Sequence, residues 1–128
     1  MQLSAFLNLI RWKNLLLILY TQLAIKYSFL TTFSTETNLT SFQFITLVLA
    51  VICITAAGYI INDIYDVEAD IINKPKKLII TKYFSVETAR KLYFYTNTIG
   101  VSLGVLISLN IQKPSLSFIF IVAALLLY

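Results

Sequence analysis

The chain has 128 residues, of which 59% are hydrophobic and only 12% are charged, and its formal net charge is +4. A soluble domain usually has about 25% charged residues, so this chain has too few charges to cover a water-facing surface and is predicted to be an integral membrane protein. The absence of histidine excludes Ser-His-Asp and Cys-His catalysis and histidine-ligated zinc, and the single cysteine, Cys53, allows no disulfide within the chain. A metal ion would therefore have oxygen ligands, which favours Mg²⁺ or Mn²⁺.

Two hydrophobic segments occupy the first half of the chain. The first extends from about residue 14 to residue 30, a little less than the roughly 20 residues that a bilayer span needs. Lys26 lies near its far end, from where the side chain can reach the membrane interface. The second segment, residues 42–62, is uncharged and long enough to span a bilayer.

Two more hydrophobic segments occupy the second half. The third, residues 86–109, follows Ser85, a predicted helix N-cap that places Glu87 in the first turn. The fourth, residues 115–128, is apolar up to its last residue. A helix that stops inside a bilayer leaves carbonyl groups unpaired, so either this helix ends at an interface or the chain is part of a longer protein. We favour the second interpretation and expect residues 1–128 to be the N-terminal part of one all-α, polytopic transmembrane bundle.

Small residues recur at every fourth position of the third segment. They are Thr96, Gly100, Gly104 and Ser108. Such a stripe lets membrane helices approach closely, although a span rich in small residues can also contain it by chance. The pattern predicts that this helix packs against neighbouring helices.

Basic residues are distributed unevenly between the loops. Arg11 and Lys13 precede the first hydrophobic segment, whereas residues 31–41 contain no lysine or arginine. Six more basic residues cluster between the end of the second segment and the first turns of the third, namely Lys74, Lys76, Lys77, Lys82, Arg90 and Lys91. The positive-inside rule predicts a cytoplasmic N-terminus and a cytoplasmic acidic loop, in a multi-pass protein of a bacterial inner membrane. Nucleic acid is not an expected partner, because the basic cluster is short, adjoins the membrane and is mixed with acids.

Four of the six acidic residues lie within residues 62–70, directly after the second hydrophobic segment. If the helix continues into this region, Asp63, Asp66 and Asp70 are spaced i, i+3 and i+7 and share one face, whereas Glu68 points elsewhere. Three carboxylates on one face repel one another unless a cation neutralises them. Mg²⁺ prefers one or two carboxylates together with phosphate oxygens and water. The pattern therefore predicts that these three aspartates are catalytic residues and ligands of Mg²⁺ that bridges to a diphosphate.

Lysines follow the aspartates closely. Lys74, Lys76 and Lys77 come after Asn73 and flank the turn-forming Pro75. They can stabilise a diphosphate leaving group. Alternatively, they belong to a solvated loop and anchor it to anionic lipid. That alternative explains the aspartates less well, because topology rules do not require clustered acids.

Three short motifs resemble those of the UbiA intramembrane prenyltransferase family. The run Asn62-Asp63-x-x-Asp66-x-x-x-Asp70 is similar to the family's first aspartate-rich motif, N-D-x-x-D-x-x-x-D. Residues 72–75, I-N-K-P, are similar to the I-N-x-P that follows it in many members, and residues 11–14, R-W-K-N, to the R-x-x-N of their first helix. The resemblance covers the N-terminal half of such an enzyme.

The resemblance implies a larger helical bundle whose central cavity opens to lipid. Family members use Mg²⁺ to bind an isoprenyl diphosphate and to ionise it, and a membrane-soluble or interfacial acceptor then captures the allylic cation. By this likeness Asn62 and the three aspartates bind Mg²⁺ and diphosphate, while Arg11 and Asn14 line the same cavity. Lys74 and Lys77 add positive charge for the diphosphate.

The chain also departs from the family pattern. An arginine–proline pair and often a glycine usually follow I-N-x-P, whereas this chain has Lys77, Leu78 and, nearby, Thr81. Lysine keeps the charge but loses bidentate phosphate recognition. The family's second aspartate-rich motif is absent from these residues, so the remaining C-terminal helices are expected as partners of this part.

Several functions share this pattern. The motif region most resembles the branch that transfers geranylgeranyl to geranylgeranylglycerol phosphate, but relatives that prenylate 4-hydroxybenzoate, dihydroxynaphthoate or haem share the metal motif. A non-enzymatic alternative is a truncated relative whose acidic loop binds cations or a partner. An ion or proton pathway fits less well, because the acids lie at the end of a span.

Overall fold

A computed structural model describes residues 2–32, 39–73 and 78–127 of the chain. Within these residues it contains helices and no strand, apart from one isolated bridge between Ile80 and Phe84. The elements in chain order are α1 (Gln2–Leu9), α2 (Trp12–Ala24), the π-helix η1 (Ile25–Phe29), α3 (Leu30–Thr32), α4 (Ser41–Tyr65), α5 (Val67–Asn73), α6 (Val86–Asn110), the 3₁₀-helix η3 (Pro114–Leu116) and α7 (Ser117–Leu126). The predicted all-α class is confirmed.

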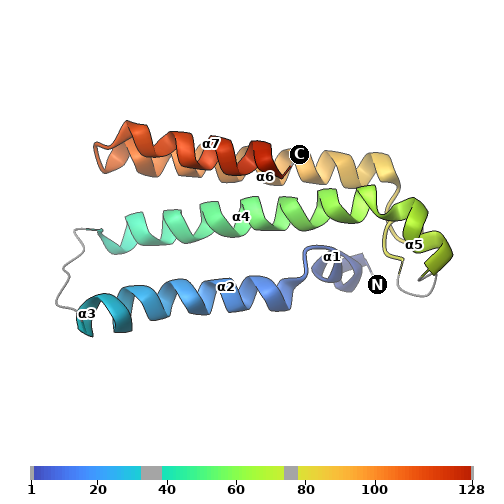
Figure 1. The fold of residues 1–128 in the computed structure, drawn as a ribbon, viewed down its shortest axis with the longest axis horizontal. Coiled ribbons are helices and arrows are strands. Elements are labelled where there is room, and N and C mark those ends of the chain that lie inside the picture. Colours follow the sequence, from blue (N-terminus) through green and yellow to red (C-terminus); the bar gives the residue numbers. More distant parts are fainter. Residues whose placement is uncertain (1, 33–38, 74–77, 128) are drawn as a thin grey trace.

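Helix α4 lies in the middle of the bundle (Figure 1). Helix α2 packs along one side of α4, and α6 packs along the other, with α7 folded back onto α6. Successive long helices run antiparallel. A capping box starts α4: the Thr40 hydroxyl accepts a hydrogen bond from the backbone N–H of Gln43 (3.2 Å), and the Gln43 side chain accepts one from the backbone N–H of Thr40 (2.8 Å).

The four predicted hydrophobic segments are all helical in the described residues. Two helices, α4 and α6, are long and apolar enough to cross a membrane. The segments Leu3–Leu9 and Trp12–Phe29 meet at an angle of 58°. If they are counted together as one broken span, the described residues contain a third span. The fourth segment forms a shorter apolar helix, Pro114–Leu126. This arrangement identifies an integral membrane protein.

Helix α1 is the element that the hydrophobic pattern does not reveal, because its eight residues are too few for a span. It is fixed by burial, since Leu9 is 0% exposed within a cluster of side chains from α1, α4, α6 and the segment before α6. The members of this cluster are Leu9, Ala57, Ile60, Ile61, Ile80, Ala89 and Tyr93. The cluster holds the corner between α1 and α2 against the end of α4.

The small-residue stripe of α6 packs against both neighbouring helices. A Cβ added at Gly100 would lie 2.7 Å from Cγ1 of Ile54 in α4, and one added at Gly104 would overlap the ring of Phe120 in α7. The Ser108 hydroxyl donates a hydrogen bond to the backbone carbonyl of Gly104 at 2.7 Å, so its polar group is satisfied inside the helix. Close helix packing along this stripe is therefore confirmed.

The segment before α6 makes a tight turn. The Thr81 backbone N–H donates to the Phe84 carbonyl at 2.7 Å, and Thr81 has φ 79°, a conformation that a β-branched residue rarely adopts. Ser85 then caps α6, because its hydroxyl accepts a hydrogen bond from the backbone N–H of Thr88 at 3.1 Å. The predicted N-cap is confirmed, and Glu87 lies in the first turn.

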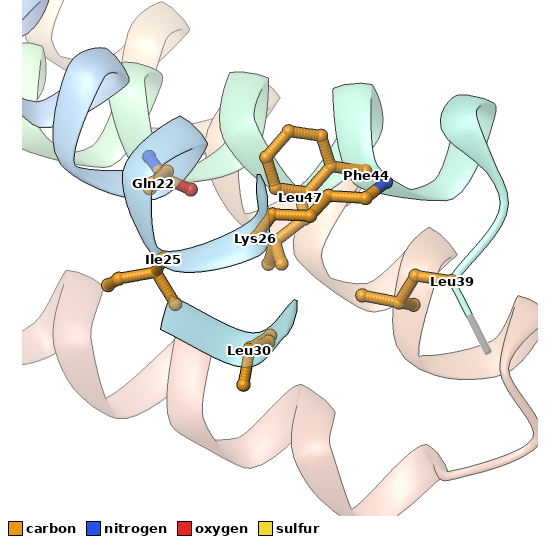
Figure 2. A pocket seen from close by; sticks show the side chains of 7 residues that line it. All are labelled: Gln22, Ile25, Lys26, Leu30, Leu39, Phe44 and Leu47. Carbon is orange, nitrogen blue, oxygen red and sulfur yellow. The ribbon is translucent and has the colours of Figure 1, made fainter. Parts of the chain in front are cut away.

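The end of the bundle away from α5 contains an apolar pocket of about 240 Å³ (Figure 2). Lys26, within the π-helix η1, extends along one wall, and its ammonium lies 4.2 Å from the ring centroid of Phe44. The other lining residues are Gln22, Ile25, Leu30, Leu39 and Leu47. The Lys26 charge is thus placed against an aromatic face near the end of the first span.

Candidate functional site

The acidic segment begins on α4 and ends on α5. Instead of one continuous helix, the structure has a junction at Asp66, and α5 turns away from the axis of α4 (Figure 1). Helical hydrogen bonding persists across the junction, from the Asp66 N–H to the Asn62 carbonyl (3.0 Å) and from the Asp70 N–H to the Asp66 carbonyl (2.8 Å). Helix α5 fully buries none of its residues, and Val67 at its start packs against the buried cluster at the end of α4.

Arg11 connects the first helical corner to the acidic segment. It adopts a left-handed conformation (φ 51°, ψ 53°) at the N-cap of α2, where the chain turns out of α1. Its Nη2 donates a hydrogen bond to Oδ1 of Asp63 at 2.9 Å, which makes an ion pair between α2 and α4. The side chain of Arg11 is 43% exposed and that of Asp63 is 23% exposed, so the carboxylate is the more buried partner.

Tyr59 contacts both Arg11 and Asn14, at the corner between α1 and α2. The guanidinium carbon of Arg11 lies 4.9 Å from the centre of the Tyr59 ring. Asn14 donates from Nδ2 to the Tyr59 hydroxyl at 3.4 Å. Arg11 and Asn14 also line a shallow pocket of about 300 Å³, together with Asn8, Trp12 and Lys13. The structure therefore brings together Arg11, Asn14, Tyr59 and Asp63, which come from two distant parts of the chain.

The remaining motif residues are Asn62 on α4, Asp66 at the junction and Asp70 on α5. Asn62 donates from Nδ2 to Oδ2 of Asp66 at 3.1 Å, which orients this exposed carboxylate. Asp70 lies on α5 and is partly buried. Among the described residues, no three acidic side chains are close enough to enclose a metal ion. This donor set fits a cation held by one or two carboxylates together with oxygens of a ligand, and it does not form a cage of protein ligands alone.

The lysines of the predicted site are outside the described residues. Lys74 and Lys77, like Lys76 between them, fall in the interval between α5 and the segment that begins at Leu78. Their contribution to diphosphate binding stays a prediction, as do the metal-binding roles of the three aspartates.

Tyr59 was not among the predicted site residues. It lies four positions before Asp63, so a helix that displays Asp63 displays Tyr59 on the same face one turn earlier. This spacing is the signal that could have revealed it. The arrangement as a whole offers a guanidinium and an amide as donors and carboxylates as acceptors at one end of the bundle, which is a combination suited to an anion bound together with a cation.

The structure is that of a membrane-embedded helical protein with a cluster of polar side chains at one end of its spans. Residues 24–128 match the UbiA prenyltransferase family, and the chain belongs to this family. The resemblance seen in its aspartate motif is thus confirmed by a match to most of the chain.

The chain is also similar to curated proteins named digeranylgeranylglyceryl phosphate synthase. It is 45% identical to that of Saccharolobus solfataricus over 56 residues, which is 44% of this chain and 20% of the relative. It is 33% identical to that of Sulfurisphaera tokodaii over 76 residues (59% and 27%) and 42% identical to that of Metallosphaera sedula over 64 residues (50% and 22%). The matches therefore cover at most 27% of the length of these relatives. No solved structure matches the chain significantly.

Proposed function

We propose that this protein is a Mg²⁺-dependent prenyltransferase that transfers a geranylgeranyl group from its diphosphate to geranylgeranylglyceryl phosphate. The observation that carries the proposal is the ion pair of Arg11 with Asp63, beside the hydrogen bond of Asn14 to Tyr59, at one end of the bundle in a chain of a prenyltransferase family. The names of the similar synthases favour this acceptor over 4-hydroxybenzoate, dihydroxynaphthoate or haem.

Each polar residue has a proposed task in this reaction. One or two of the carboxylates of Asp63, Asp66 and Asp70 would hold each Mg²⁺ together with diphosphate oxygens, because no three acidic side chains of the described residues lie close enough to enclose an ion. When bound, Mg²⁺ supplies positive charge that makes diphosphate a better leaving group. Asn62 fixes the orientation of Asp66 through its 3.1 Å hydrogen bond. Arg11 would donate its remaining N–H groups to diphosphate oxygens, because only one of its hydrogen bonds goes to Asp63 in the described residues.

We propose that the end of the bundle with the acidic segment faces the cytoplasm. The start of α2 and the start of α6 lie at this end, near α5 (Figure 1). Five described basic residues belong to or directly precede these helix starts, namely Arg11, Lys13, Lys82, Arg90 and Lys91. Lys26 belongs to η1, after α2, and Lys113 to the turn between α6 and α7, which are both at the opposite end. The excess of positive charge beside the aspartates supports this orientation through the positive-inside rule. The bacterial inner membrane stays a prediction.

A transfer assay tests the proposed function. Membranes that contain the complete protein receive radiolabelled geranylgeranyl diphosphate and one of four acceptors, with Mg²⁺ or with EDTA. We expect Mg²⁺-dependent labelling of geranylgeranylglyceryl phosphate. Asp66→Ala should lower the rate at least about 100-fold, as expected when one electrostatic group of a catalytic site is lost. Glu68→Ala is the matched control, because Glu68 is an exposed acid of the same segment outside the motif.

The outcomes separate the alternatives. Transfer to another acceptor alone would keep the reaction class and replace the acceptor. Normal turnover by Asp66→Ala would remove that carboxylate from the mechanism. Absence of transfer to every acceptor, with the protein correctly inserted, would favour a membrane protein whose acidic segment binds cations or a partner without catalysis.

A further inference from the structure

We propose that Tyr59 is a positioning residue that holds the Arg11 guanidinium and the Asn14 amide toward the diphosphate. This inference rests on the proposed function and assigns a role to a side chain outside the aspartate motif. Tyr59 contacts both residues at once, with 4.9 Å from its ring centre to the Arg11 guanidinium carbon and 3.4 Å from its hydroxyl to Asn14 Nδ2.

The two contacts constrain a side chain that is otherwise long and exposed. Arg11 is 43% exposed, and its described side-chain contacts are the Asp63 carboxylate and the Tyr59 ring. An arginine side chain has several rotatable bonds, so a guanidinium held by one hydrogen bond alone can still swing about that bond. The Tyr59 ring supplies a second contact, which restricts this rotation.

The chemistry of the ring suits an arginine that must bind an anion. A carboxylate neutralises the guanidinium, whereas an aromatic face attracts it without cancelling its charge. An Asp63 oxygen that ligates a divalent cation is a weaker acceptor for Arg11. The Tyr59 ring is then the contact that keeps Arg11 beside the site with its positive charge available for phosphate oxygens.

Tyr59 is placed for this role and not for core packing. Ala57, Ile60 and Ile61 of the same helix belong to the buried cluster at this end of the bundle, whereas Tyr59 lies outside that cluster and is only partly buried. Its hydroxyl is engaged by Asn14, so both the ring and the hydroxyl serve the corner between α1 and α2.

Two measurements on the complete protein in lipid nanodiscs test this role. The first requires no metal or ligand: phenylglyoxal modifies arginine side chains, and mass spectrometry compares Arg11 with Arg90 as an internal reference. We expect Tyr59→Leu to speed Arg11 modification several-fold and Tyr59→Phe to leave it unchanged.

The second measurement is equilibrium binding of geranylgeranyl diphosphate with Mg²⁺ and no acceptor, where Tyr59→Leu should weaken binding about tenfold. Tyr95→Leu, on a 69% exposed residue of α6, is the matched control.

A double-mutant cycle separates positioning from general destabilisation. In an Arg11→Gln background, Tyr59→Leu should weaken binding by a clearly smaller factor than in the wild type, because only the Asn14 contact is then left to lose. An equal loss in both backgrounds, or unchanged Arg11 reactivity in Tyr59→Leu, overturns the inference. If Tyr59→Leu does not fold, Tyr59→Phe and Asn14→Ala test the role of the Tyr59 hydroxyl instead. Each change alone should weaken binding by the same factor, and the two together should weaken binding no more than either one. Full additivity of these two changes overturns the role of the hydroxyl.

Failure of the proposed function and failure of the role of Tyr59 give different results in these measurements. A wild-type protein without Mg²⁺-dependent binding of geranylgeranyl diphosphate contradicts the prenyltransferase proposal. The phenylglyoxal comparison in ligand-free protein would still show whether Tyr59 holds Arg11.

Discussion

Replacing Gly100 with alanine should weaken the packing of α6 against α4. The added Cβ would lie 2.7 Å from Cγ1 of Ile54, 2.9 Å from the backbone nitrogen of Ile54 and 3.1 Å from the carbonyl oxygen of Ala50. Two of these three atoms belong to the backbone of α4, so the helices themselves must separate. Overpacking of this kind costs about 1–3 kcal/mol, and alanine recovers about 1 kcal/mol over glycine in a helix, so we expect the free energy of unfolding to fall by about 1 kcal/mol.

Unfolding in mixed detergent micelles measures this change in the free energy of unfolding. Circular dichroism follows the loss of helix as the fraction of dodecyl sulfate rises. Gly58→Ala is the matched control, because the three atoms nearest to its Cβ would all belong to the Leu127 side chain, with Cδ2 at 3.0 Å, and a side-chain end can shift more easily than a helix backbone. The control should therefore be as stable as the wild type or slightly more stable. The reasoning is refuted if Gly100→Ala proves as stable as Gly58→Ala.

Two further substitutions test the segment that leads into α6. Thr81→Gly should raise the free energy of unfolding by about 1 kcal/mol, because glycine accepts φ 79° without strain; a lower melting temperature would contradict this. Ser85→Ala should lower the free energy of unfolding by about 1 kcal/mol, because the backbone N–H of Thr88 loses its acceptor, and Ser85→Asp should retain the cap. Equal melting temperatures for Ser85→Ala and Ser85→Asp would show that the cap contributes nothing.

Much of the fold could be predicted from the sequence, because hydrophobic runs of membrane length have few alternatives to a helix. The uncharged run before Asp63 predicted α4, and Ser85 predicted where α6 begins. The stripe that contains Gly100 predicted close packing, since small side chains are what permits it. Its partner, Ile54 of α4, could not be predicted, because the periodicity of one helix does not identify its neighbour.

The site was predictable only in part. Spacing placed Asp63 and Asp66 at the end of a span, but it did not show the junction at Asp66, after which α5 fully buries none of its residues. The left-handed backbone of Arg11 depends on α1 being buried against α4, and no local pattern predicts that. Tyr59 was missed because one tyrosine in an apolar helix has no special signature until Arg11 is seen against its ring.

Electron paramagnetic resonance of Mn²⁺, used in place of Mg²⁺, tests most directly whether the carboxylates bind a metal together with diphosphate. The complete protein in nanodiscs is titrated with Mn²⁺, with and without geranylgeranyl diphosphate and without any acceptor. We predict Mn²⁺ binding that depends on the diphosphate in the wild type and in Glu68→Gln, and that is lost when Asp63→Asn and Asp66→Asn are combined. Equal Mn²⁺ binding by all three proteins would contradict the assignment of the aspartates as metal ligands.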